Sequence, residues 1–292
     1  NQRVITEETS KPLEVKGHSS LVRVDDDTYA LAYDQLGGYI TTFTVPADGS
    51  SITEVATALE HDTEKGQFNS LVKVDDDIYA LAYAGEGDDG YIKTFTISAD
   101  GSSITQIASL EHDEGKGTHN SLVKADEDTY VLAYGCPDPP DDGNSGGQSV
   151  NACISTFTIP ADGSSITEVA TLDHDTYGAF NFLVKMDHNT YVLIYEGSGK
   201  DIKTFAIPPD GSSITEITFL QSDSWDSASL VKVDSDTYAM AYGAAPYNRI
   251  TTYTIPADGS SITEVASLEH DNYQSISWPN NSYDERHNTS FV

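Results

Sequence analysis

The sequence has few basic residues, few cysteines and no long apolar run, and each shortage excludes a class of protein. Only 15 Lys and Arg stand against 47 Asp and Glu among 292 residues, which gives a formal net charge of −32. This balance excludes nucleic acid as a partner, because phosphate binding depends on clustered cations. No apolar stretch approaches the about eighteen residues that a membrane-crossing helix needs, so we predict no membrane span.

The two cysteines, Cys136 and Cys153, flank the one long insertion in an otherwise regular sequence. A predicted strand ends near Cys136 and another begins at Cys153, so we expect the two to lie within bridging distance and to form a disulfide. A disulfide is typical of proteins outside the reducing cytosol, and we therefore expect an extracellular or cell-surface location. The chain opens on Asn1 without a basic and then apolar leader, so we interpret it as a mature or trimmed product or a fragment.

The sequence also lacks helix periodicity and the common catalytic signatures. No apolar stripe of period 3.6 lasts for two helical turns. No phosphate-binding glycine motif, nucleophile elbow or H-E-x-x-H pattern occurs. These absences favour an all-β protein and weigh against several large classes of enzyme.

What the sequence does contain is a repeat. The stretch Ala-Asp-Gly-Ser-Ser-Ile-Thr at residues 47–53 returns almost unchanged at residues 99–105, 161–167, 209–215 and 257–263. Its glycines stand at 49, 101, 163, 211 and 259, so the intervals are 52, 62, 48 and 48. A period near fifty residues indicates a repeat architecture, and five copies predict one closed array over residues 1–292 as a single domain.

Each unit reads as four strands. In the first unit, residues 20–24 and 28–33 read as two strands joined by an Asp turn at 25–27. In the second unit, residues 91–97 and 104–110 read as a third and a fourth strand joined by the Asp-Gly turn, whose Gly supplies the positive φ that a tight hairpin needs. Four antiparallel strands in about fifty residues make one blade of a β-propeller.

The two ends of the chain predict the number of blades. Residues 4–7 resemble the start of a fourth strand at residues 52–54, and residues 287–290 match either the start of a first strand or the first hairpin of the repeat. Pairing the ends in one blade would remove the exposed strand edges of an open array. We therefore predict six blades with the sixth shared between the N- and C-terminal strands; five and seven blades are the alternatives.

The pattern of the second unit, Phe95-Thr96-Ile97 followed by Asp100-Gly101 and Ile104-Thr105, resembles repeats of lactonase-like and YVTN-type β-propellers. The resemblance covers nearly the whole chain and implies the fold, while propellers as a group include hydrolases, lyases, lectins and scaffolds. The turn is also similar to the Asp-box of sialidase propellers. A sialidase is excluded, because the Asp and Gly are adjacent here and only four arginines occur.

Ligand-binding residues are expected on the face that carries the second-to-third loops and the links between blades, because all the length variation lies there. The links repeat a Glu-His-Asp pattern at His61, His112 and His270, and this repetition favours a structural role. Deeper in, residues at the start of the first strands converge towards the axis, and two tryptophans that break the repeat could stack on a sugar. The predicted ligand contacts are His18, Phe68, His119, Phe180, Trp225 and Trp278.

The Asp clusters at residues 25–27, 75–77 and 126–128 contain the oxygen ligands that calcium prefers. They lack the D-x-D-x-D-G spacing of calcium loops, so solvated hairpin turns are the preferred interpretation. We therefore predict no cofactor. Calcium is the one cation that these clusters could bind, and the identity of any metal ligands stays open.

The sequence thus predicts an extracellular, non-enzymatic propeller that binds a glycan or a protein partner through its loop face. A lactonase-like or other hydrolase with a divalent cation at the channel mouth is one alternative. A structural element of a larger surface protein is another. The near-identity of the units weighs against an enzyme, because catalytic residues from different blades must differ to form one site. The oligomeric state stays open.

Overall fold

The computed structural model describes residues 19–137, 150–197, 199–222, 228–244 and 247–272. These residues form twenty-one strands, β1 to β21, and a single helical element, the 3₁₀ turn η1 (Glu86–Asp88). The predicted all-β class is therefore confirmed. No helix in the described part of the chain is long and apolar enough to cross a membrane.

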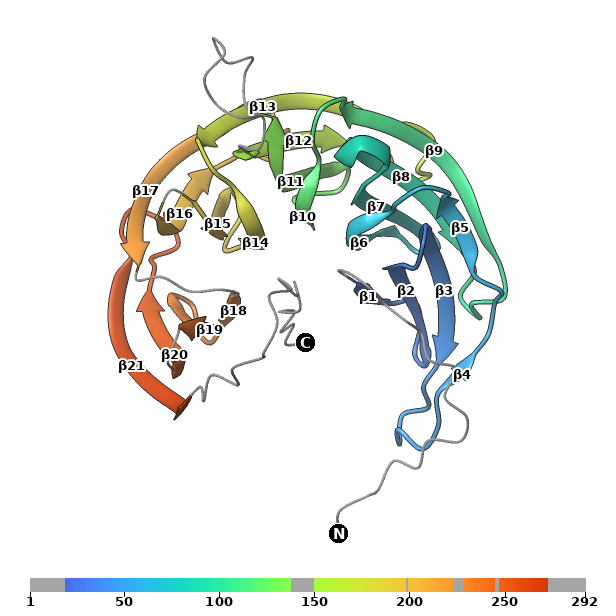
Figure 1. The fold of residues 1–292 in the computed structure, drawn as a ribbon, viewed down its shortest axis with the longest axis horizontal. Helices are drawn as coiled ribbons and strands as arrows, with labels where there is room; N and C mark the ends of the chain where they lie inside the picture. The colour runs from blue at the N-terminus through green and yellow to red at the C-terminus, as the bar shows by residue number, and fades with distance from the viewer. Residues whose placement is uncertain (1–18, 138–149, 198, 223–227, 245–246, 273–292) are drawn as a thin grey trace, which may run out of the picture. The chain divides into compact units, whose positions relative to one another are not determined.

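The strands form five antiparallel sheets, blades 1 to 5, in which neighbouring strands follow one another in chain order (Figure 1). Blade 1 contains β1 (Ser20–Arg23), β2 (Thr28–Asp34), β3 (Gly38–Thr44), β4 (Thr53–Glu54) and β5 (Leu59–Asp62). Blade 2 contains β6 (Gln67–Asp75), β7 (Ile78–Ala84), β8 (Gly90–Ile97) and β9 (Ile104–Asp113). Blade 3 contains β10 (Thr118–Lys124), β11 (Thr129–Pro137), β12 (Val150–Thr158) and β13 (Thr167–Asp175). Blade 4 contains β14 (Ala179–Lys185), β15 (Thr190–Glu196), β16 (Lys200–Ala206) and β17 (Thr215–Ser222). Blade 5 contains β18 (Ala228–Lys232), β19 (Thr237–Ala244), β20 (Tyr247–Thr254) and β21 (Thr263–Asn272).

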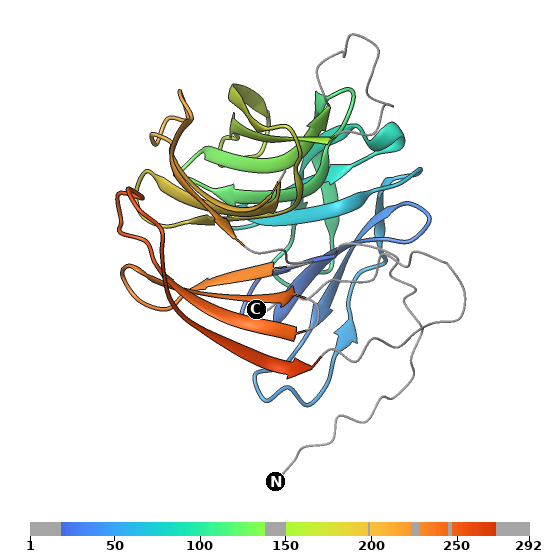
Figure 2. The same ribbon diagram turned by 60° about the vertical axis from the view of Figure 1, so that its left-hand side comes forward.

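The five blades that the five complete repeats predict are all present in the described residues. In blade 1 the fourth strand is broken into β4 and β5, which both pair with β3, so this sheet also has four strand positions. Figure 2 shows the four strands of blade 5 side by side, in orange to red. The predicted sixth blade falls on residues 1–18 and 273–292, which lie outside the described residues.

The chain divides into two compact units, which are treated separately below. The first consists of residues 1–128 and 158–168, and the second of residues 129–157 and 169–292. Each unit contains a core formed between consecutive blades. In the first, the small residues Ala30 and Ala32 of β2 are fully buried in one cluster with Leu71 of β6, so one blade's small face accepts the next blade's bulky side chains.

The repeated Ala-Asp-Gly turn connects consecutive blades. The Thr42 hydroxyl on β3 donates to the Gly101 carbonyl of the next blade's turn at 2.7 Å, and it accepts from the Ala56 amide at 3.2 Å. The same threonine-to-glycine bond recurs with lengths of 2.7–2.8 Å in Thr94–Gly163, Thr156–Gly211 and Thr204–Gly259. We call each of these contacts a turn–socket joint; the organising stretch of the sequence is therefore the connector between blades.

Glycine is required in these joints for two reasons. Gly101 has φ +69°, and a Cβ atom there would lie 2.9 Å from Thr28 Cγ2 and 3.1 Å from Thr42 Cβ. The turn is shaped locally by its aspartate, since Asp100 Oδ1 accepts a hydrogen bond from the Ser102 amide at 3.0 Å. Close approach and a left-handed backbone together explain why the stretch varies so little.

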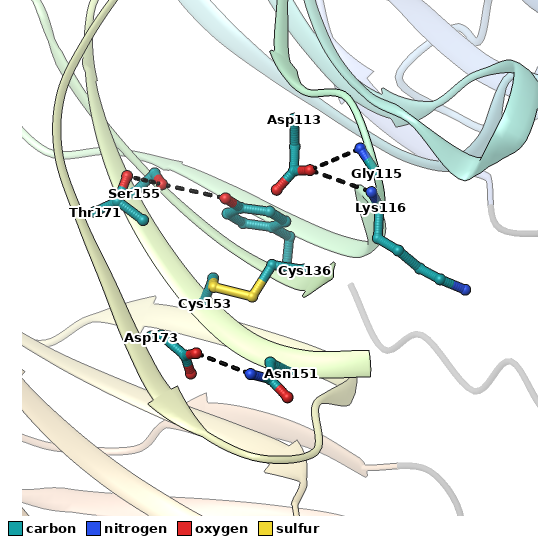
Figure 3. Close-up of a disulfide and its surroundings, with 10 residues drawn as sticks. Asp113, Gly115, Lys116, Cys136, Asn151, Cys153, Ser155, Thr171 and Asp173 are labelled. Atoms are coloured by element: carbon teal, nitrogen blue, oxygen red, sulfur yellow. Dashed lines mark hydrogen bonds between the residues drawn. A yellow bond between two sulfur atoms is a disulfide. The ribbon is translucent and has the colours of Figure 1, made fainter. Parts of the chain in front are cut away.

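The predicted disulfide between Cys136 and Cys153 is confirmed. It links β11 to β12 with a Cα–Cα distance of 5.8 Å (Figure 3). Next to it on β12, Asn151 donates to the Asp173 carboxylate at 2.8 Å, and the Ser155 and Thr171 hydroxyls lie 2.7 Å apart. The bridge closes the base of the long insertion, as the sequence predicted.

Candidate functional site

Three of the predicted ligand contacts occupy the second position of a first strand. Phe68, His119 and Phe180 lie at the start of β6, β10 and β14 and have φ values of 54°, 53° and 50°. The ladders of β6 and β14 shift register at this point, so each strand begins with a bulge. A left-handed backbone is rare for bulky residues and costs on the order of 1–3 kcal/mol, and such strain is concentrated at functional sites.

In the first unit, an asparagine holds the left-handed backbone at both positions. Asn69 Nδ2 donates to the Gly66 carbonyl at 2.7 Å, and Asn120 Nδ2 donates to the Gly117 carbonyl at 2.7 Å. Asn120 Nδ2 also lies 3.3 Å from the Phe68 carbonyl, so the start of β10 is tied to the start of β6. These bonds fix the backbone that carries Phe68 and His119.

The two side chains form an aromatic pair. The ring centroids of Phe68 and His119 lie 4.3 Å apart at an interplanar angle of 58°, and both residues are half-buried. Such a pair offers an apolar surface for stacking together with a histidine that can donate or accept hydrogen bonds. Phe180 in the second unit is half-buried at the equivalent position. His18, Trp225 and Trp278 lie outside the described residues.

The Glu-His-Asp links have a different role. His61, at the end of blade 1, is buried with its ring 4.6 Å from the Tyr83 ring and 6.4 Å from the Phe95 ring of blade 2. Lys93 Nζ donates to the His61 carbonyl. Burial, with a smaller contribution from Lys93, lowers the pKa of His61 to about 3. This histidine is thus neutral and fills the space between two blades.

The second unit repeats this arrangement. The His174 ring lies 5.0 Å from Tyr195 and 5.2 Å from Phe205, and Lys203 Nζ donates to the His174 carbonyl at 2.8 Å. Burial, and then Lys203, lowers the pKa of His174 to about 3. Both links therefore have the structural role that their repetition favours.

One polar cluster between blades 3 and 4 was missed by sequence reasoning. The Tyr195 hydroxyl donates to Asp175 Oδ2 at 2.7 Å, and the nearby Asp201 is only 5% exposed. Burial, followed by the charge of Asp175, raises the pKa of Asp201. The ladder pairs this aspartate with Tyr195, whereas Tyr39 and Tyr91 stand at the equivalent positions of blades 1 and 2. Alignment of the units at this position would have found the cluster.

The calcium hypothesis finds no ligand set in the described part of the chain. No group of three or more His, Cys, Asp or Glu there is arranged to hold a metal ion. In the first Asp turn, the Arg23 guanidinium donates to Asp26 Oδ1 at 3.2 Å and to the Asp25 carbonyl at 2.9 Å. This turn is thus bound by a cation of the chain itself.

No family model matches the chain, and no curated protein matches its sequence. A protein from Lactobacillus plantarum has a similar structure, with a TM-score of 0.62 and 13% identity over 82% of this chain and 67% of that one. Sqt1 of Saccharomyces cerevisiae is also similar, with a TM-score of 0.56 and 8% identity over 90% of this chain and 64% of Sqt1. The sheets are β-propeller blades. For the periplasmic gluconolactonase PpgL of Pseudomonas aeruginosa the TM-score is 0.49 and the identity 12%, over 86% of this chain and 85% of PpgL. At these identities the likeness concerns the fold of this propeller and no activity.

Proposed function

We propose that this propeller is an extracytosolic binding module and that it binds a glycan at the aromatic pair of Phe68 and His119. The observation that supports this most strongly is the way the pair is held. Two half-buried rings lie 4.3 Å apart on a left-handed backbone that two asparagines fix. A strained, left-handed backbone that recurs at Phe68, His119 and Phe180 has a physical reason if the rings it orients must contact a ligand.

Glycan is the ligand class that fits these side chains and the charge of the protein. The C–H face of a sugar ring stacks on aromatic rings, and its hydroxyls can pair with a histidine. A net charge of −32 disfavours phosphorylated and other anionic ligands, so a neutral or amino sugar is expected. The Cys136–Cys153 disulfide supports a location outside the reducing cytosol, where glycans are abundant.

The test is a glycan array with the intact protein, followed by calorimetry on the best neutral or amino glycan. We expect Phe68→Ala and His119→Ala each to weaken binding about tenfold or more, which is about 1.4 kcal/mol. Phe219→Ala is the matched control, because Phe219 is 61% exposed on the fourth strand of blade 4. An array without a hit, or a hit that all variants bind equally, would refute the proposal. If the protein binds another protein but no glycan, the proposed glycan ligand is wrong and a protein ligand takes its place.

A hydrolase is the second candidate, and the Asp175–Tyr195–Asp201 cluster favours it. A buried carboxyl whose pKa is raised beside a second carboxylate is a candidate general acid, and it breaks the symmetry of the repeat. It ranks second because Asp201 is only 5% exposed, which leaves little room for substrate contact. Turnover of lactones or aryl glycosides that Asp201→Asn abolishes and Asp100→Asn preserves would support it.

We also propose that residues 1–292 form one propeller domain and that its two ends share a sixth blade. The open face of blade 5, described next, supports the C-terminal half of this proposal.

A further inference from the structure

The exposed side chains of blade 5 differ from their counterparts in every other blade. Just after the first strands of blades 1 and 4, Val24 and Met186 are 6% and 5% exposed and lie in clusters with residues of the following blade. The equivalent Val233 is 61% exposed. Val24 and Val233 are the same residue type, so the difference in their exposed fractions follows from whether a neighbouring blade covers the position.

The third and fourth strands give the same result. Ile250 of β20 is 43% exposed, whereas its counterparts Ile40, Ile92, Ile154 and Ile202 are fully buried. On β21, Val265 and Leu268 are 62% and 64% exposed, more than any of their counterparts. The open face of blade 5 is defined by Val231, Val233, Ile250, Val265 and Leu268. A contiguous apolar face of this kind is an interaction surface.

The open face also contains a threonine, Thr252, at the position that forms the turn–socket joint in other blades. Thr204 of blade 4 donates to the Gly259 carbonyl of the following turn at 2.8 Å and lies 3.5 Å from the Thr218 carbonyl of its own blade. Thr252 is its counterpart in blade 5, and its hydroxyl donates within its own blade, to the Ala266 carbonyl at 3.4 Å. Among the residues that the structure describes, no turn contacts Thr252 as Gly259 contacts Thr204.

The course of the chain indicates what covers this face. After each earlier fourth strand, the chain begins the next first strand within a few residues, as from β9 at Asp113 to β10 at Thr118. That first strand packs on the preceding blade: β6 packs on β1 and β2, β10 on β6 and β7, and β18 on β14 and β15. β21 ends at Asn272, and twenty residues follow it. The same course would bring these residues onto β18 and β19.

We infer that residues 273–292 cover the open face of blade 5 as the beginning of a sixth blade. Within this segment, residues 287–290 resemble either the start of β10, with one residue more than His119-Asn120-Ser121, or the hairpin at residues 188–190. In both matches the apolar Phe291 and Val292 continue as a strand of the repeat. A segment tethered to the edge strand of blade 5 has a high effective concentration at that face. A second copy is disfavoured, because two molecules that each carry a charge of −32 repel each other.

Single-cysteine labelling tests this inference in the full-length chain. Both natural cysteines are in the disulfide, so Leu268→Cys introduces the one free thiol. Its rate of reaction with a soluble disulfide reagent is compared with Phe219→Cys, an exposed reference, and Leu220→Cys, the covered counterpart in blade 4. We expect the thiol at 268 to react at least tenfold more slowly than that at 219. Adding Phe291→Asp should restore the fast rate.

Three results would overturn the inference. The thiol at 268 could react as fast as the thiol at 219, which would mean that nothing covers the face. It could react slowly whether or not Phe291 is replaced, which would mean that another element covers it. It could react slowly only at high protein concentration, which would identify a second copy as the cover. Val233→Cys provides a second reporter on β18 in case Leu268→Cys does not fold.

Discussion

The turn–socket joint leads to a prediction for which another copy of the repeat provides the control. Gly101 and Gly49 occupy the same position of the same turn, with φ values of +69° and +64°. A Cβ atom at Gly101 would lie 2.9 Å from the Thr28 methyl, whereas a Cβ atom at Gly49 would have nothing within 4 Å among the described residues. Gly101→Ala and Gly49→Ala therefore impose the same backbone strain, and among the five described blades only the first forces the turn away from a preceding blade.

The two losses can be estimated separately. An alanine in the left-handed region costs about 1–2 kcal/mol, part of which is offset by the lower entropy of the unfolded chain. Forcing an extra methyl group into a closely packed contact costs about 1–3 kcal/mol more. We therefore expect Gly49→Ala to lose about 1 kcal/mol and Gly101→Ala about 2–4 kcal/mol. The difference corresponds to a fall in Tm of several degrees.

The assay is urea denaturation followed by circular dichroism and tyrosine fluorescence, with thermal melts in parallel. Coincident transitions by both probes would justify comparing the free energies of unfolding. Gly163→Ala and Gly259→Ala should behave like Gly101→Ala, since each Cβ atom would lie 2.8 Å from a methyl group of the preceding blade. Equal losses for Gly49→Ala and Gly101→Ala would refute the assignment of the turn as a joint between blades.

Three further predictions test other parts of the structure. Replacing Cys136 and Cys153 by Ser opens a loop of eighteen residues (153 − 136 + 1) and should lower the free energy of unfolding by about 3 kcal/mol in the chain-entropy model. Reduction of the disulfide in the unmodified protein should give a similar loss. An unchanged free energy of unfolding would contradict a stabilising role of the disulfide. Thr204→Val should lower stability by about 1–3 kcal/mol, because it leaves the buried Gly259 carbonyl without its donor, whereas Thr252→Val should change stability by less than about 1 kcal/mol. Burial holds the pKa of His174 at about 3, below its ordinary value of 6.5. The stability that depends on neutral His174 is therefore complete above about pH 6.5 and is lost as the pH falls towards 3. Thermal melts across this range should show a shallower loss of stability for His174→Gln than for the unmodified protein, and parallel curves would contradict the account.

Much of the fold could be predicted because the repeat contains its own alignment. The strands expected at residues 91–97 and 104–110 correspond to β8 and β9, and the Asp-Gly turn lies between them. Local chemistry was sufficient here, since alternation and a turn glycine specify a hairpin without reference to the rest of the chain. The disulfide was predictable for the same reason, because both cysteines flank a single hairpin.

The joints between blades were beyond sequence reasoning. The bond from Thr42 to Gly101 spans 59 residues, and nothing in the threonine distinguishes it from other strand threonines. The left-handed backbone at Phe68 and His119 was missed as well, because bulky residues there contradict local preference and are stabilised by Asn69 and Asn120. A glycine at these positions would have predicted the bulge.

The Asp201 cluster was missed for a third reason. Sequence reasoning used what the units share, whereas Asp201 marks a position at which they differ. Its neighbour Asp175 follows His174 in the link after blade 3, and its carboxylate accepts the Tyr195 hydroxyl. A residue can therefore belong to a repeated pattern and also take part in a contact that the pattern does not predict.

Nuclear magnetic resonance of the histidine side chains tests the central claim, glycan binding at Phe68 and His119, most directly. The ring C–H resonances of His119 are followed while the best glycan from the array is added to the intact protein, with His61 and His174 as internal controls because both lie in joints between blades. The account predicts that the His119 resonances shift with the same dissociation constant that calorimetry gives, while those of His61 and His174 stay in place. A glycan that binds and leaves the His119 resonances unmoved would contradict it.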